Sequence, residues 1–264
     1  MRVLEGQSAI VTGVGGGFGR SIALALADAG AAVTLTSRRS HEIDDVRRIV
    51  EEAGGRAQAI VADLMDTPAA AQVYAAHQKA FGPLHILINS GGVAEPYGPI
   101  GEVDPAAWWR TVGAHVLGPV NYMTVAIDDM KKAGYGIIIN ICSLDALRAR
   151  PNQSAYCVAK TAQMRLSEHV AQECAGSGVA VFAVHPGYAM TPPAESMLHS
   201  KEARRWLPDF VKLVESVKAM GGNMEDLRRC GEKCVALATG RFNHLSGTFI
   251  NFHEFDPNAP TAPA

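Results

Sequence analysis

The chain has 264 residues, of which 48% are apolar and 19% charged, a composition typical of a globular protein with a large core. Its net charge of −2 and isoelectric point of about 6.5 argue against nucleic acid or an anionic membrane surface as a partner. Apolar runs such as Gly136–Cys142 are far shorter than the ~20 residues of a membrane-spanning helix. The segment Met1–Gln7 lacks the apolar stretch of a secretory signal, so we expect a cytoplasmic protein.

Short β-prone runs alternate with helical stretches along the chain. Runs rich in Val, Ile, Leu and Ala predict parallel strands buried on both faces, at Ser8–Thr12, Ala32–Thr36, Ala57–Ala62, His85–Ser90, Gly136–Cys142 and Val179–His185. Helical periodicity is found between them, at Ser21–Ala29, Ile43–Ala53, Pro68–Ala80, Pro105–Lys132 and Gln153–Ala175. The repeated strand–helix–strand pattern predicts an α/β fold: a doubly wound parallel sheet, Rossmann-like, with helices on both faces. We expect residues 1–264 to form a single domain.

Two segments depart from this alternation. Thr191–Asn223 opens with two prolines and carries Trp206, Phe210 and further apolar residues, which predicts a pair of short helices with one apolar face. Buried packing explains that face, and so does a lid over a substrate pocket. The tail Asp256–Ala264 is rich in Pro and Ala, and we expect it to be loose or to pack on a neighbouring subunit.

Cysteine and histidine spacing argues against a metal site and a disulfide scaffold. The five cysteines are an odd number without a Cys-x-x-Cys pair. Cys230 and Cys234 lie one helical turn apart and are expected as small apolar residues on a buried helix face. His244 and His253 have no partners at metal-ligand spacing, so we expect no metal.

A glycine-rich loop, Thr12–Gly19, follows the first predicted strand and precedes a helical run. Glycines let the backbone turn tightly and approach a pyrophosphate, while the amides of the following helix face the anion. Such a loop alone could be only a flexible turn. Its place in the first strand–helix–strand unit predicts a dinucleotide site, and the absence of a following Gly-Lys-Ser/Thr disfavours a P-loop.

The second predicted strand is followed by Ser37, Arg38 and Arg39 rather than by an acidic residue. A carboxylate at this position would bind the adenosine ribose hydroxyls and favour NAD, whereas a guanidinium can pair with a 2′-phosphate. A solvated basic loop is the alternative. We predict NADP(H) in preference to NAD(H), with Arg38 as the stronger phosphate ligand because it is closer to the strand end.

Tyr156 and Lys160 lie four residues apart, on the same face of a predicted helix. A neighbouring ammonium stabilises tyrosinate, so we expect the phenol pKa to be lowered from its usual ~10. Such a phenol can protonate a carbonyl oxygen or deprotonate an alcohol. Ser143 follows a predicted strand at the carboxyl edge of the sheet, where its hydroxyl could bind the same substrate oxygen. A Tyr-x-x-x-Lys pair alone is common, but its combination with Ser143 and the upstream glycine loop is a specific signature.

Several nearby residues have weaker interpretations. Asp145, Arg148 and Arg150 follow Ser143 and could line the pocket and meet a polar substrate, but exposed loop charges are the simpler expectation. His185 is expected to be a packing residue at the end of its strand.

These spaced motifs resemble the short-chain dehydrogenase/reductase family over nearly the whole chain. The family's Thr-Gly-x-x-x-Gly-x-Gly loop matches at Thr12–Gly19, and its Asn-Asn-Ala-Gly element appears, altered in the middle, at Asn89–Gly92. The catalytic serine and the Tyr-x-x-x-Lys motif match at Ser143, Tyr156 and Lys160. Pro186-Gly187, followed by Thr191, resembles the turn that contacts the nicotinamide end.

The resemblance implies a set of roles for individual residues. Asp63 would contact the adenine, Thr191 the carboxamide or phosphates, and Lys160 the nicotinamide ribose. The cofactor site implied in this way comprises Gly13, Gly17, Phe18, Gly19, Ser37, Arg38, Asp63, Leu64, Asn89, Gly91, Tyr156, Lys160 and Thr191. A homotetramer or dimer built through the long helices Pro105–Lys132 and Gln153–Ala175 is also implied.

One position departs from the family pattern. The family places a catalytic asparagine in the helix after the fourth strand, where it helps to hold a water that links the lysine to solvent; counting from Trp108 to Gly118, this chain has His115. Histidine titrates near neutrality, so it would make a pH-sensitive relay. Alternatively, His115 only packs in the helix while backbone and water carry the relay.

The leading functional hypothesis is reversible hydride transfer between NADP(H) and a small-molecule carbonyl or secondary alcohol, with an apolar or aromatic substrate suggested by Thr191–Asn223. A second hypothesis keeps the fold but makes the chain a nucleotide-binding sensor or scaffold, which the altered Asn89–Gly92 element and His115 leave open. A third is an isomerase or lyase that uses the same tyrosine. The fold does not choose among them.

Overall fold

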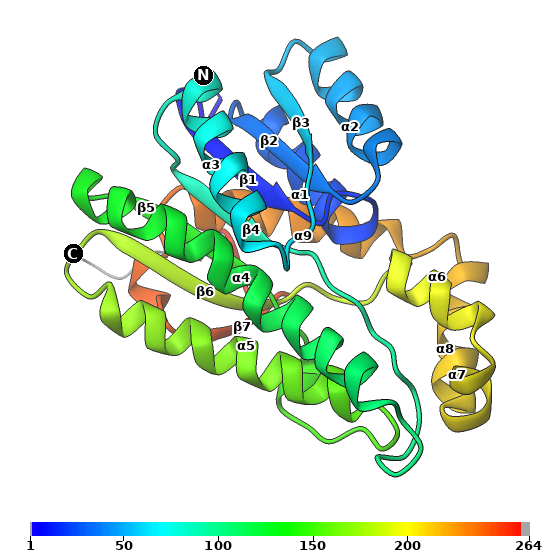
Figure 1. Cartoon of the computed structure of the whole chain (residues 1–264). Coiled ribbons are helices and arrows are strands. Elements are labelled where there is room, and N and C mark those ends of the chain that lie inside the picture. The colour runs from blue at the N-terminus through cyan, green and yellow to red at the C-terminus, as the bar shows by residue number, and fades with distance from the viewer. Residues whose placement is uncertain (1, 260–264) are drawn as a thin grey trace.

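A single seven-strand parallel sheet forms the centre of the computed structural model, which describes residues 2–259. The strand order is β3-β2-β1-β4-β5-β6-β7 (Figure 1). The strands are β1 (Ser8–Thr12), β2 (Ala32–Ser37), β3 (Ala57–Val61), β4 (Ile86–Asn89), β5 (Gly136–Ile141), β6 (Val179–His185) and β7 (Phe249–Asn251). The predicted doubly wound α/β fold is confirmed, and the six predicted strands are present. The seventh, β7, was not predicted from the sequence.

Helices cover both faces of the sheet (Figure 1). One face carries α1 (Gly17–Asp28), α2 (Ser40–Glu52) and α9 (Met224–Ala238). The other face carries α3 (Thr67–Phe81), α4 (Pro105–Ala133) and α5 (Ser154–Glu173). Side-chain caps fix where two of these helices begin, since Asp66 accepts a hydrogen bond from Ala69 at α3 and Asp104 accepts two at α4. No described helix is both long and apolar enough to cross a membrane.

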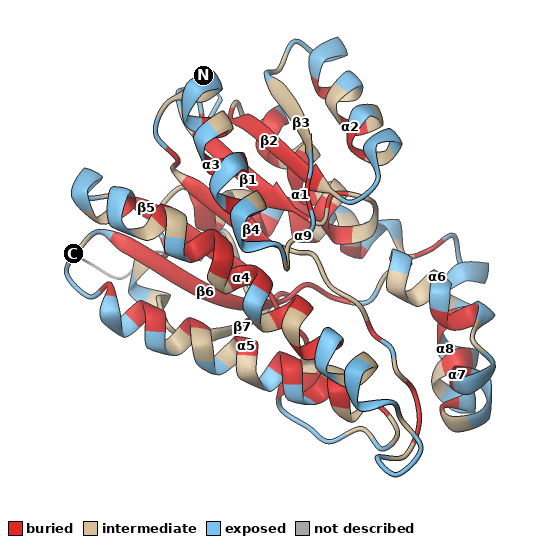
Figure 2. Ribbon diagram, viewed as in Figure 1, coloured by how far each residue is buried: buried red, intermediate tan, exposed pale blue. Residues whose placement is uncertain are grey.

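The inner strands β1, β2, β4, β5 and β6 are buried on both faces, as Figure 2 shows for the central part of the sheet. The predicted burial of β3 is wrong, because this strand lies at the edge of the sheet and is only partly covered. Along β5, Ile137 and Ile139 join the apolar cluster beneath α1 and α9, whereas Ile138 joins the cluster beneath α3, α4 and α5. This alternation follows from the two-residue period of a strand. Because both faces are covered, most positions of β5 are apolar, which explains the continuous Ile-Ile-Ile run, and the buried Asn140 is accommodated by side-chain hydrogen bonds.

The segment Thr191–Asn223 forms three helices, α6 (Pro192–His199), α7 (Lys201–Trp206) and α8 (Pro208–Ala219), and the predicted pair was wrong in number. The extra boundary arises because Ser200 caps α7 through the Ala203 amide and Pro208 begins α8. We call residues 192–219 the α6–α8 unit. It lies beside the main body in Figure 1 and has an apolar cluster of its own, which includes Met197 and Val211.

Two shorter helical turns complete the description, a 3₁₀ helix η1 at Leu144–Ala146 and another, η2, at Asn243–Leu245. Of the predicted tail, residues 256–264, the part from residue 260 onwards lies outside the described residues. The five cysteines are free and buried, as the expected packing role of Cys230 and Cys234 requires.

Candidate active site

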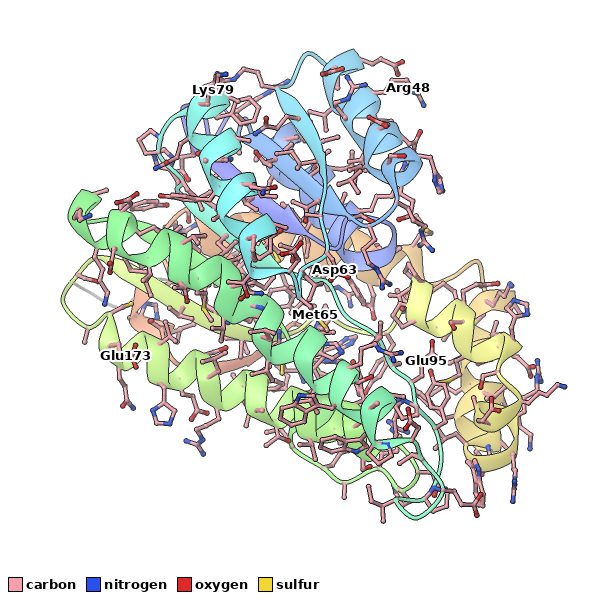
Figure 3. All side chains as sticks on the ribbon, viewed as in Figure 1. Arg48, Asp63, Met65, Lys79, Glu95 and Glu173 are labelled. Carbon is pink, nitrogen blue, oxygen red and sulfur yellow. The ribbon has the colours of Figure 1, made fainter. Side chains whose placement is uncertain are left out.

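A cleft of about 1110 Å³ lies at the carboxyl edge of the sheet, which is large for a small-molecule site (~300–1,000 Å³). Most of the predicted site residues line it, namely Gly13, Phe18, Gly19, Ser37, Arg38, Asp63, Leu64, Gly91, His115, Ser143, Tyr156, Lys160 and Thr191. Figure 3 labels Asp63 and Met65, which mark the part of this edge that follows β3, and Glu95, on the loop after β4. Parallel strands bring these residues together because all their carboxyl ends meet at one edge.

Two of the predicted cofactor residues do not line the cleft. Asn89 is the last residue of β4 and is buried, and its Nδ2 donates a hydrogen bond of 2.8 Å to Oδ1 of Asn140 on β5. Gly17 opens α1 and faces Thr191, whose Cγ2 would lie 2.7 Å from a Cβ at position 17. Both residues therefore support the walls of the cleft.

The glycine loop forms a cradle between β1 and β4. A Cβ on Gly13 would lie 2.4 Å from the Cα of Gly91, so the loops that follow these two strands meet backbone to backbone. Helix α1 begins at this cradle, and no side chain caps its first amides. Uncapped amides at a helix start suit an anion, so the cradle fits the pyrophosphate of a dinucleotide.

At the end of β2, the two arginines differ in their partners. Both line the cleft, but Arg39 forms an ion pair with Glu42, whereas Arg38 makes no ion pair or side-chain hydrogen bond within residues 2–259. Glu42 also accepts a hydrogen bond of 3.0 Å from Ser37 Oγ. Sequence reasoning missed Glu42, because the carboxylate comes from the first turn of α2 rather than from the strand end.

Lys160 is buried at the base of the cleft. Its Nζ donates to the carbonyl of Ile141 at 2.6 Å and to Oε1 of Gln163 at 2.9 Å, and lies 5.7 Å from the ring centroid of Tyr156. Burial lowers the pKa of Lys160 to about 8, because the charged form loses water. Gln163 was also missed, although its spacing of three residues from Lys160 places both on one helix face.

The phenol of Tyr156 differs from the expectation. Burial raises its pKa above the usual value, and the Ser143 hydroxyl beside it acts in the opposite direction. The expected net lowering of this pKa is not found, because the burial of the phenol dominates and the Lys160 ammonium is turned towards the Ile141 carbonyl. A phenol with a raised pKa is protonated near pH 7, which suits a proton donor.

His115 is buried against Tyr156, with the two rings edge to face at a centroid distance of 5.3 Å. Its Nε2 lies 2.7 Å from the Val93 carbonyl and must carry the proton of that hydrogen bond, while the buried Nδ1 has no partner among the described residues. Burial and the charge of Lys160 hold the pKa of His115 well below its usual 6.5. The imidazole is therefore neutral near pH 7.

The expectation of exposed loop charges is correct for Arg148, whose side chain is 51% exposed, and wrong for Asp145, which is buried, while Arg150 is half-buried. The Asp145 side chain is only 7% exposed, and all three residues line the cleft. The 3₁₀ turn after β5 folds Asp145 inwards, where both arginines reach its Oδ1. His185 is buried as expected, and burial lowers its pKa to about 4.

Comparison with known proteins adds the family. A model of the short chain dehydrogenase family matches residues 7–202. The cis-4-hydroxycyclohexanecarboxylate dehydrogenase of Sinomonas cyclohexanicum is 36% identical over 184 residues, 70% of this chain and 74% of that protein. Levodione reductase has a similar fold, with a TM-score of 0.82 and 21% identity, over 96% of this chain and 100% of that one. A metagenomic short-chain oxidoreductase solved in complex with NADP is 32% identical, with a TM-score of 0.68, over 72% of this chain and 87% of that one.

The family match covers both the glycine cradle and the cleft residues Ser143, Tyr156 and Lys160. It confirms the resemblance inferred from the sequence motifs. The named relative is a dehydrogenase, in agreement with a small-molecule substrate. The chain therefore belongs to the short-chain dehydrogenase family of oxidoreductases.

Proposed function

We propose that the protein is an NADP(H)-dependent oxidoreductase that moves a hydride between nicotinamide and a carbonyl or secondary alcohol. The observation that carries the proposal is the half-buried Tyr156 phenol, which lies beside Ser143 and Lys160 in the cleft that the glycine cradle opens into. A protonated phenol beside a hydroxyl and an ammonium is the arrangement that carbonyl reduction needs.

In the reduction direction, bound NADPH supplies the hydride to the carbonyl carbon. The Ser143 hydroxyl donates a hydrogen bond that orients the carbonyl oxygen, and Tyr156 Oη gives its proton to that oxygen. Lys160 stabilises the tyrosinate that remains, and it is the proposed ligand of the nicotinamide ribose. His115 is the proposed acceptor in the path that returns a proton to Tyr156, through its unpartnered Nδ1.

The preference for NADP(H) is supported by Arg38, which faces the cleft without an ion-pair partner in the described chain. The 2′-phosphate would pair with its guanidinium. A related structure contains NADP, which agrees with this assignment. Glu42 acts in the opposite direction, because its carboxylate would repel a phosphate, and Arg39 offsets part of that charge. Asp63, Leu64 and Thr191 are proposed for the adenine and the nicotinamide end.

The substrate end of the cleft has largely apolar walls. The α6–α8 unit contributes its apolar lining residues, Met197, Phe210, Leu213, Val214 and Val217, and Met190 comes from the preceding loop. We propose that the α6–α8 unit is a lid and that the substrate has an apolar or aromatic body. The protein is proposed to act as a soluble homo-oligomer of the cytoplasm, paired through α4 and α5.

The proposed activity is tested by following NADPH oxidation with a panel of ketones and aldehydes. Tyr156→Phe removes the proton donor, so kcat should fall at least ~100-fold while the Kd for NADPH stays within about twofold. Wild-type protein that binds NADPH but reduces no carbonyl compound would favour the sensor hypothesis. Product formed without net NADPH consumption would favour an isomerase or lyase.

Cofactor preference is tested with Arg38→Gln and Glu42→Gln. Arg38→Gln should lower kcat/KM for NADPH about 30-fold, because a charge-assisted pair with the 2′-phosphate is lost. Glu42→Gln should raise it about 3- to 10-fold, because a neighbouring negative charge is removed. The measurement is the ratio of kcat/KM for NADPH and NADH in each variant. A wild-type preference for NADH would contradict the proposal.

The pH dependence of carbonyl reduction should report Lys160. Its charged form is disfavoured by burial, so the ammonium loses its proton as pH rises through about 8. Neutral Lys160 no longer stabilises tyrosinate, and kcat/KM for NADPH should fall about tenfold per pH unit above that value. In Lys160→Arg the charge persists, so the falling limb should disappear. A flat wild-type profile up to pH 10 would exclude this role.

The role of His115 is tested by two substitutions. His115→Phe keeps a ring edge against Tyr156 but has no acceptor, so kcat should fall about tenfold or more. His115→Asn supplies an amide acceptor and should retain kcat within about threefold. Thermal melting of both variants controls for misfolding. An unchanged kcat and pH profile in the Phe variant would remove His115 from proton transfer.

A further inference from the structure

The wall of the cleft beside Ser143 holds two guanidinium groups against one carboxylate. Arg148 Nε lies 2.9 Å from Oδ1 of Asp145, and an Nη of Arg150 lies 3.0 Å from the same oxygen. All three side chains line the cleft that contains Tyr156. We call them the arginine cluster. Its formal charge is +1, so a single anion would neutralise it.

The geometry of Arg150 leaves hydrogen-bonding capacity unused. Its side chain is 21% exposed, and its buried Nε has no hydrogen-bond partner among the described residues. A guanidinium has five N–H donors, and a buried donor without a partner is unfavourable. The guanidinium also lies over the ring of Phe210, with Cζ 4.1 Å from the centroid, so its plane is held against α8.

No other carboxylate at the substrate end compensates this charge. Within residues 2–259, the remaining acidic residues that line the cleft are Glu42, in the first turn of α2, and Asp63, after β3, both at the proposed adenosine end. Lys160 adds a further cation near the reacting position. Positive charge is in excess at this end of the cleft, because Arg148, Arg150 and Lys160 face only one carboxylate, that of Asp145. The surrounding walls are largely apolar, so electrostatic attraction is screened less than in water.

We propose that the substrate carries a carboxylate that is bound by Arg150, with Arg148 as its neighbour, so that the enzyme acts on an oxo acid and its hydroxy acid. This proposal rests on the proposed hydride transfer and adds the chemical class. The substrate carboxylate neutralises the positive charge that remains after Asp145 is counted, through charge-assisted hydrogen bonds to the Arg150 guanidinium. The apolar body of the substrate lies along Phe210 and Val214.

Turnover is tested with oxo acids and their methyl esters, which keep the reacting carbonyl but lack the charge. The wild-type enzyme should prefer the acid about 100-fold in kcat/KM, mainly through KM. Arg150→Gln should bring the ratio of acid to ester close to one. The control is Arg205→Gln, because Arg205 stacks on Trp206 in the same way but does not line the cleft, and this variant should keep the wild-type ratio.

Binding is tested separately from turnover, by titrating the NADPH complex with benzoate and with neutral benzamide. Benzoate should bind the wild type and the Arg205→Gln variant at least about tenfold more tightly than benzamide, and this difference should be lost in Arg150→Gln. Equal reduction of acids and esters, or equal binding of the two probes, would overturn the carboxylate site and leave the proposed function standing. Selective benzoate binding without reduction of any carbonyl compound would support the site and refute hydride transfer.

Discussion

The contact between the loops that follow β1 and β4 sets the position of everything else in the cleft. Gly13 and Gly91 approach so closely that neither tolerates a side chain without displacement of the backbone or of Leu64. These strands are neighbours because the sheet order reverses between them, with α1 leaving to one face and α4 to the other. A parallel sheet opens a crevice at such a reversal. The position of the cradle therefore follows from the strand order, and the glycines, which have no side chain, let the two loops approach closely enough to form it.

Lys160, the proposed catalytic lysine, is held by polar groups that do not line the cleft. Lys160 Nζ donates to the side-chain oxygen of Gln163, and the backbone carbonyl of Gln163 accepts a hydrogen bond from the Ser167 hydroxyl. The Ser167 oxygen accepts a hydrogen bond from the Asn140 amide, whose own oxygen accepts one from Asn89. This chain of hydrogen bonds crosses two strands and α5 through the interior of the protein. In a medium of low polarity such a chain is strong and orders its members. Asn89 thus supports the orientation of Lys160 from beneath the cleft without touching it.

The sequence was sufficient for the elements whose pattern is local and long. Continuous apolar runs revealed the buried strands, and the glycine loop with Ser143, Tyr156 and Lys160 indicated residues that the structure brings together around one cleft. It was insufficient where three-dimensional neighbours decide: β7 has three residues and therefore no measurable period. The carboxylate of Glu42 reaches Ser37 only after α2 folds back.

The electrostatics of the site show the same limit. The pKa of the Tyr156 phenol is raised mainly by burial, and the spacing of Tyr156 and Lys160 in the sequence does not show how deeply the phenol is buried. Asp145 looked like a loop charge because sequence spacing does not show that the 3₁₀ turn after β5 brings its carboxylate into the cleft wall, where Arg148 and Arg150 bind it.

Because Tyr156 packs against the apolar cluster of the α6–α8 unit, movement of this proposed lid would change the acidity of the phenol. This unit contacts the main body through Ala94, Tyr97 and the Tyr156 ring. If it separates, water reaches the phenol and the penalty on tyrosinate is removed, so the open form is the more acidic one. Linkage makes the effect reciprocal: a ligand that holds the unit in place raises the proton affinity of Tyr156, and loss of that proton favours opening. If the product leaves when the proposed lid opens, release of the product and release of the Tyr156 proton both depend on the same opening equilibrium.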